Sequence, residues 1–181
     1  MGMWQMPAHC EFDSRTPSIP ECRYRAMWAY NAQNDSIRFG VQAKNYGLDW
    51  TGIGFSRDRL MPDSDVVYGW VSPETGNVTL IDGHLDGYGP PRPDVRRDVT
   101  RVSGSLVNGI TSLQFWRPRA TGDRDDVQFT DDDCFYFLFP YDTNRYKPGV
   151  MRHRSTPMVS EQRICIRPCM MMMMMSCVCR V

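Results

Sequence analysis

The order of apolar and polar residues predicts a chain of short β-strands. In residues 36–44, Ile37, Phe39, Val41 and Ala43 alternate with polar residues or glycine. This period of two is typical of a strand with one buried face. Similar runs occupy residues 23–30, 50–56, 65–72, 77–82, 98–107, 110–118, 134–140 and 162–166, with clusters of Gly, Pro, Asp and Asn between them. The pattern predicts an all-β protein built as an antiparallel sandwich.

The run CFYFLFP at 134–140 is apolar on both faces apart from its ends. We expect a strand in the interior of a sheet that is covered on each side. Residues 1–21, rich in turn-forming residues, are expected to form an irregular lead-in. Residues 168–181 contain six consecutive methionines, which no packing requires, and we expect a disordered Met/Cys-rich tail. The β-sandwich domain is therefore expected over residues 22–167.

Composition narrows the classes of function. The 181 residues suffice for one domain with a sizeable core. Lys and Arg total 21, Asp and Glu also total 21, and the two signs are interspersed. A chain without net charge has no field that favours nucleic acid or an anionic membrane, so we set nucleic-acid binding aside.

The seven cysteines lie at positions 10, 22, 134, 165, 169, 177 and 179, with two at the front, one late in the body and four in the last seventeen residues. This clustering suits disulfides that tie the ends of a secreted β-domain. The sequence does not determine which cysteines pair, and because their number is odd at least one remains outside such pairs. The chain shows no secretory segment at its start and no apolar run of about 18 residues. We expect an extracellular or secretory-lumen protein of which this chain is a fragment.

Four stretches carry a more specific signal, and they follow one another along the chain. They are WTGIGFS at 50–56, MPDSDVVYGWV at 61–71, NVTLIDGHLDGYGPPRPDVRRDVTRVSG at 77–104 and NGITSLQFWRPRATGDRDDVQF at 108–129. In order and spacing they resemble the DOMON domain, the module named after the amino-terminal part of dopamine beta-monooxygenase. The resemblance covers about residues 22–166 and implies an immunoglobulin-like antiparallel β-sandwich of about 8–11 strands.

The end of the domain carries a narrower resemblance. CFYFLFP followed by MRHRSTPMVSEQRICI at 151–166 is similar to the DOMON module of Knickkopf-type proteins, extracellular proteins that organise cuticle chitin in arthropods. This resemblance implies an extracellular or lumenal setting and a role in the extracellular matrix.

Two side chains are implied as ligands of a cofactor. DOMON modules of the cytochrome type hold a b-type haem between a methionine on the loop before the Asp-hydrophobic strand and a histidine near the end of the domain. The matching positions here are Met61 and His153. The flanking Arg152 and Arg154 either pair with the haem propionates or keep the loop in water. A thioether and an imidazole give iron two axial ligands and suit electron transfer. No Cys-x-x-Cys-His occurs, so the haem would be non-covalent.

A weaker alternative metal site lies in DGHLDGY. Asp82, His84 and Asp86 are spaced by two and share one side of an extended segment, either as a metal site or as a polar strand edge. The connection at 119–133 carries six aspartates without the spacing of a dedicated calcium loop, and it is expected to be a solvated loop.

Two functions follow as hypotheses. The first is an electron-transfer module that holds haem b through Met61 and His153 and serves a redox partner domain or protein. The second is a non-catalytic matrix or cuticle module whose aromatic side chains stack on sugar rings such as those of chitin. The candidates for stacking are Trp50, Trp70, Tyr88 and Trp116. Neither hypothesis places a catalytic site in this chain alone.

Overall fold

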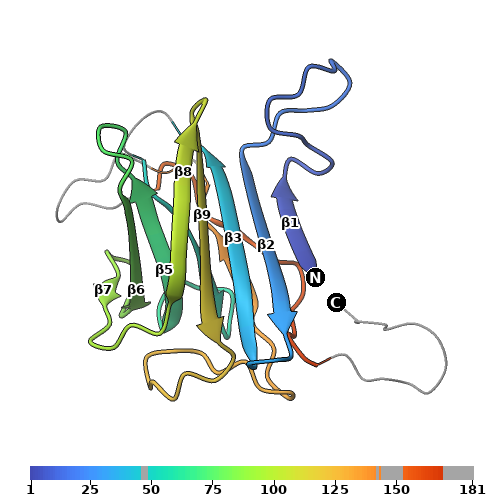
Figure 1. Ribbon diagram of the computed structural model, residues 1–181. Helices are drawn as coiled ribbons and strands as arrows, with labels where there is room; N and C mark the ends of the chain where they lie inside the picture. The colour runs from blue at the N-terminus through green and yellow to red at the C-terminus, as the bar shows by residue number, and fades with distance from the viewer. Residues whose placement is uncertain (46–48, 142, 144–152, 169–181) are drawn as a thin grey trace.

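Two antiparallel sheets lie face to face in the computed structural model, which describes residues 1–45, 49–141, 143 and 153–168 (Figure 1). One sheet has the order β1-β2-β3-β9-β8 and the other β11-β10-β4-β5-β6-β7. The strands are β1 (Gly2–Met6), β2 (Tyr24–Asn31), β3 (Ser36–Lys44), β4 (Thr51–Ser56), β5 (Ser64–Val71), β6 (Val78–Leu85), β7 (Arg92–Pro93), β8 (Thr100–Val107), β9 (Ile110–Pro118), β10 (Tyr136–Phe139) and β11 (Met158–Val159). The predicted all-β sandwich is confirmed. No helix long and apolar enough to cross a membrane occurs in the part of the chain that the structure describes.

The two ends of the described chain differ from expectation. The lead-in begins with β1, which pairs along its whole length with β2, and Trp4 of β1 stacks on Phe139 at a ring-centroid distance of 4.1 Å. The run at 162–166 is not a strand, because only Ile164 forms a bridge, to Phe135. The short strand β11 lies before it and pairs with β10. Both differences come from tertiary contacts that local pattern does not encode.

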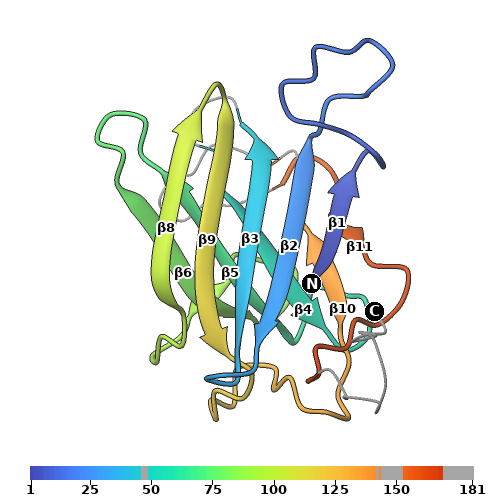
Figure 2. The same ribbon diagram turned by 45° about the vertical axis from the view of Figure 1, so that its right-hand side comes forward.

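Aromatic side chains fill the space between the two sheets, whose strands lie one layer over the other in Figure 2. Phe39 of β3 packs on Phe115 of β9 within one sheet, and both rings are buried. Across the interface, Phe39 lies 5.3 Å from Phe55 of β4. Phe55 also contacts Phe137 of the neighbouring strand β10 at 5.0 Å and Phe129 of the connection after β9 at 5.1 Å, both in edge-to-face geometry. Such pairs add about 0.5–1.5 kcal/mol to the burial of each ring.

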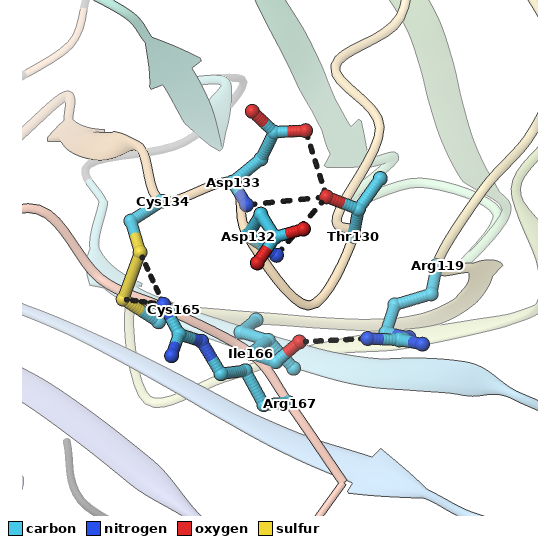
Figure 3. Close-up of a disulfide and its surroundings, with 8 residues drawn as sticks. All are labelled: Arg119, Thr130, Asp132, Asp133, Cys134, Cys165, Ile166 and Arg167. Carbon is cyan, nitrogen blue, oxygen red and sulfur yellow. Dashed lines mark hydrogen bonds between the residues drawn. A yellow bond between two sulfur atoms is a disulfide. The ribbon is translucent and has the colours of Figure 1, made fainter.

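Two disulfides close the margins of the sandwich. Cys10 joins Cys22 in the lead-in, and Cys134 joins Cys165 (Figure 3). Figure 3 also shows Arg167, whose Nη2 lies 3.3 Å from the Cys134 sulfur. The expected pairing of cysteines near the chain ends is confirmed for these four. The remaining three cysteines lie outside the described residues.

A buried ion pair joins the two sheets. Arg117 of β9 is fully buried and donates from Nη1 to Asp65 Oδ2 of β5 at 2.6 Å. Its Nη2 donates to the Val127 carbonyl at 2.8 Å and lies 3.3 Å from Asp126 Oδ2. Burial acts to lower the pKa of the guanidinium, but the carboxylates of Asp65 and Asp126 raise it above its ordinary value. Arg117 therefore stays charged and holds β5 against β9.

Replacing Arg117 by alanine tests this role. Removing one partner leaves buried carboxylates without compensation, which typically costs 3–5 kcal/mol, so we expect Arg117→Ala to lose about 3–5 kcal/mol in the free energy of unfolding. Urea denaturation of the full chain measures the loss. Arg38→Ala, an exposed arginine on the neighbouring strand β3, is the control and is expected to change stability by less than about 0.5 kcal/mol. Equal effects of the two variants would contradict the assigned role.

Candidate functional site

Strand β5 is buried on both faces, and its outer face builds the candidate site. Val67 and Val71 belong to the core between the sheets. Val66 and Tyr68 point the other way and form a second buried cluster with Trp50 and Leu85. Met61 packs against this outer cluster, as does Ile81. Since a sheet of a sandwich commonly has one solvated face, an apolar layer here indicates a ligand site.

A cavity of about 500 Å³ opens over this outer face. Its volume lies in the range of small-molecule and cofactor sites. Its lining is mainly apolar and comprises Trp50, Gly52, Ile53, Gly54, Met61, Val66, Val67, Tyr68, Leu85, Tyr88, Gly89, Pro90, Pro91, Leu138, Pro140, His153 and Pro157. Gly54 keeps the floor flat, because a Cβ there would lie 3.1 Å from Val66 Cγ1 and 3.2 Å from Leu138 Cβ. A flat apolar floor suits a planar ligand.

Met61 stands on a turn that is braced at both ends. The Leu60 carbonyl accepts hydrogen bonds from Ser56 Oγ and Ser64 Oγ, each at 2.9 Å. Asp58 accepts from the Leu60 amide at 3.0 Å, so the residue before Met61 is bonded through both of its backbone groups. The end of β4 and the start of β5 thereby fix the backbone immediately before Met61.

His153 reaches the same cavity from the far end of the domain. Its backbone forms an isolated antiparallel bridge with Thr143, and the Thr143 hydroxyl donates to the Trp50 carbonyl. Trp50 itself lines the cavity. The structure thus brings Met61 and His153, 92 positions apart in the sequence, to one cavity. Arg154 is exposed beside His153, whereas Arg152 lies outside the described residues.

The four aromatic residues proposed to stack on sugars do not share one surface. Trp50 is buried in the cavity wall, and its Nε1 has no hydrogen-bond partner among the described residues. Tyr88 lines the mouth and is 74% exposed. Trp70 is half-buried in β5, and Trp116 is half-buried in β9 of the opposite sheet beneath Arg101. Of these four candidates, only Trp50 and Tyr88 line the same cavity and can contact one ligand there.

The weaker metal candidates separate in space. Asp82 is buried between the sheets, and His84 Nδ1 lies 2.9 Å from the Asp125 carbonyl. Asp86 is exposed beyond the end of β6 and pairs with Arg92 at 3.2 Å. Within the described ranges, the acidic and histidine side chains whose ligand atoms gather are instead Asp65, Asp82 and Asp126.

Burial controls the protonation of this acidic group. It raises the pKa of Asp65 to about 7, although the Arg117 guanidinium opposes the shift. It also raises the pKa of Asp82 to about 6, with the Asp98 amide opposing. The group lies on the core side of β5 and β6, while the cavity lies on their outer side. The two features are separate sites.

Sequence reasoning missed most of the cavity wall. Tyr68, Leu85 and Leu138 line the cavity, and no motif singled them out. The signal for Tyr68 and Leu138 was their place in runs that are apolar on both faces, which predicts cover on each side of the sheet. Leu85 stands among polar residues and glycines and had no such signal. Gly89, Pro90 and Pro91 carried no signal beyond a turn.

The chain is similar in sequence to one known protein and in fold to two solved structures. MOXD1 homolog 1 of Drosophila melanogaster is 31% identical over 112 residues, which are 60% of this chain and 16% of that protein, so the chain matches a small part of that relative. The cytochrome domain of Myriococcum thermophilum cellobiose dehydrogenase superposes with a TM-score of 0.54 at 14% identity, over 87% of this chain and 79% of that one. The cytochrome b domain of pyranose dehydrogenase from Coprinopsis cinerea gives 0.51 at 18% identity, over 76% and 74%. At 14% and 18% sequence identity, the similarity to these two structures shows a shared fold and nothing about function.

The family model described as the DOMON domain matches residues 20–142, which include β2 to β10. The match covers more than half of the chain and agrees with the motifs and the two-sheet sandwich, so this chain belongs to the DOMON domain family.

Proposed function

We propose that the cavity binds a b-type haem and that the domain transfers electrons to or from a partner. The observation that carries the proposal is that a methionine and a histidine, distant in sequence, line one apolar cavity of about 500 Å³. The donor set fits haem iron, since a thioether and a neutral imidazole are a known axial pair. Met61 would supply the sulfur and His153 the nitrogen. When bound, the haem supplies one-electron chemistry.

The surroundings of both ligands support this use. The braced turn at Leu60 reduces the entropy lost when Met61 is fixed, and the bridge to Thr143 does the same for the backbone of His153. Two axial protein ligands leave no open position for a substrate, so the chemistry is electron transfer. We propose that Arg154, which is exposed next to His153, pairs with a propionate, and that Arg152 does the same.

The partner and the setting follow as part of the proposal. Two fold neighbours are named as the cytochrome domain of a cellobiose dehydrogenase and the cytochrome b domain of a pyranose dehydrogenase, so each is one domain of a larger redox enzyme. The chain matches 16% of the length of its relative from Drosophila melanogaster, and we propose a separate redox domain or protein as the partner. Two disulfides support an extracellular or lumenal setting.

A second candidate is binding of a matrix polysaccharide such as cuticle chitin. The observation that favours it is Tyr88, a large aromatic side chain that is 74% exposed at the mouth of the cavity, near Pro90 and Pro91. Exposed aromatic rings stack on the apolar faces of sugars. In this candidate the cavity serves as the end of a sugar groove, and Met61 and His153 line it without iron.

Haem titration with paired variants tests the first candidate. We expect the full chain to give a low-spin spectrum with a shifted Soret band, Met61→Ala to become high-spin, and His153→Ala to bind haem at least about tenfold more weakly. Met158→Ala and His9→Ala replace residues outside the cavity lining and should leave the spectrum unchanged. A spectrum that is the same in all four variants would exclude the ligand pair.

The brace under Met61 gives a second test. Ser64→Ala removes one of two hydrogen bonds to the Leu60 carbonyl, which is worth about 1 kcal/mol. We expect roughly fivefold weaker haem binding and a partial high-spin population, because the thioether is held less firmly. Ser72→Ala, which removes a hydroxyl from an exposed turn far from the cavity, is the control. If Ser64→Ala binds haem like the unmodified chain, the turn does not pre-position Met61.

The sugar-binding candidate predicts a different response. Chitin oligomers should change the tryptophan fluorescence of the chain, and Tyr88→Ala should weaken that binding by about 1–2 kcal/mol through loss of the stacking ring. Trp116→Ala, on the opposite sheet, should leave it unchanged. A flat titration with the unmodified chain would remove this candidate.

A further inference from the structure

Three buried carboxylates converge on the side of β5 and β6 that faces away from the cavity. Asp65 comes from β5, Asp82 from β6 and Asp126 from the connection between β9 and β10. Their exposed fractions are 1%, 2% and 7%. One oxygen from each lies within 4.8 Å of the other two. Carboxylates this close and this deeply buried repel one another unless something positive lies among them.

Protein donors orient these carboxylates but do not satisfy them. Asp65 Oδ2 accepts from Arg117 Nη1 at 2.6 Å and from the Val127 amide at 2.9 Å. Asp82 Oδ2 accepts from the Asp98 amide at 2.9 Å. The second oxygens, Oδ1 of Asp65 and of Asp82, are buried and have no hydrogen-bond partner among the described residues. In each of these two carboxylates, one oxygen therefore accepts hydrogen bonds and the other has no hydrogen-bond partner among the described residues.

Asp126 is the least satisfied of the three. Its Oδ2 forms the 3.3 Å ion pair with Arg117, but neither of its oxygens accepts a hydrogen bond within the described part of the chain. Next to this group, both oxygens of Asp94 and Oδ2 of Asp98 are buried without a hydrogen-bond partner as well. Native structures contain few such atoms, since each costs about 1–3 kcal/mol. Their concentration at one point indicates a missing ligand.

The charges indicate the sign and size of that ligand. Arg117 is the cation that contacts the group, so when all three carboxylates are ionised two negative charges have no partner among these residues. Asp94 and Asp98 have their own arginine partners at 3.8 and 3.0 Å, Arg92 and Arg96, both of which are exposed. A divalent cation balances the group.

We propose that Asp65, Asp82 and Asp126 bind one Ca²⁺ ion, with the free oxygens of Asp94 and Asp98 within the same acidic site. All the donor atoms are oxygen, which calcium prefers. Calcium–oxygen distances of 2.3–2.6 Å place opposite ligands up to about 5 Å apart, which matches the separation within 4.8 Å observed here. Magnesium binds at about 2.0–2.1 Å in near-ideal octahedral geometry, so it fits this spread less well.

The ion would tie together segments that are distant in sequence. Asp82 already receives the Asp98 amide, and its carbonyl accepts from the Asp94 amide at 3.0 Å. A shared ion adds a link from these residues to β5 and to the connection that carries Asp126. Because Val66 follows Asp65 and lines the cavity, the site would stabilise the cavity floor from behind. It does not depend on haem binding.

Calcium titration of the full chain tests the site. After treatment with EGTA, isothermal titration calorimetry with CaCl₂ should give one equivalent bound. The midpoint of thermal unfolding should rise by about 5–10 °C when free Ca²⁺ exceeds its Kd about 100-fold. MgCl₂ should give a smaller rise at the same concentration, and NaCl at matched ionic strength should give none.

Isosteric variants locate the binding. Asp126→Asn and Asp82→Asn each remove one ligand charge and should weaken calcium binding about tenfold or more. Asp132→Asn, at an exposed position of the connection that carries Asp126, should bind like the unmodified chain.

Three results would overturn the proposal: no heat and no thermal shift in the unmodified chain with millimolar calcium, an equal shift with NaCl, or unchanged affinity in both site variants. If a site variant fails to fold, the titration of the unmodified chain still decides the question.

Discussion

The ion pair between Arg117 and Asp65 is the contact on which the arrangement of the sandwich depends. It crosses from β9 in one sheet to β5 in the other, at 2.6 Å and with both side chains buried. The guanidinium also packs over the rings of Phe55 and Phe129, 5.6 Å from each centroid. Because a buried charge without a partner is so costly, this pair permits few relative positions of the two strands. The position of β5 in turn fixes everything built on its other face.

Strand β5 links two kinds of chemistry through the alternation of its side chains. Asp65 faces the core and the acidic group, while Val66 faces the cavity. On the core side, the carboxylates around Asp65 are stabilised by positive charge. On the outer side, an apolar surface is lined at its margins by the Met61 thioether and the His153 imidazole. A sheet with buried side chains on both faces needs loops that cover its outer face. The residues around Tyr88 and His153 cover that face here. The stability of the fold and the shape of the site are therefore coupled through one strand.

The sequence predicted what local pattern encodes and missed what long-range packing decides. The strict alternation at 36–44 identified β3, and the doubly apolar run at 134–140 identified β10 with its cover on both sides. The short strand β1 was missed because its place depends on the packing of Trp4 against Phe139, far along the chain. Met61 and His153 were found through family resemblance, since neither is distinctive alone. The acidic group could not be predicted, because its members come from three separate segments that only the fold brings together.

The central claim is that the cavity holds iron between a thioether and an imidazole. X-ray absorption at the iron edge of the haem-loaded chain tests it most directly, because sulfur and nitrogen scatter differently at short range. We expect one sulfur atom in the first coordination shell of the iron in addition to nitrogen, and the loss of that sulfur in Met61→Ala. A first shell without sulfur in the unmodified chain, or a sulfur signal that persists in Met61→Ala, would contradict it.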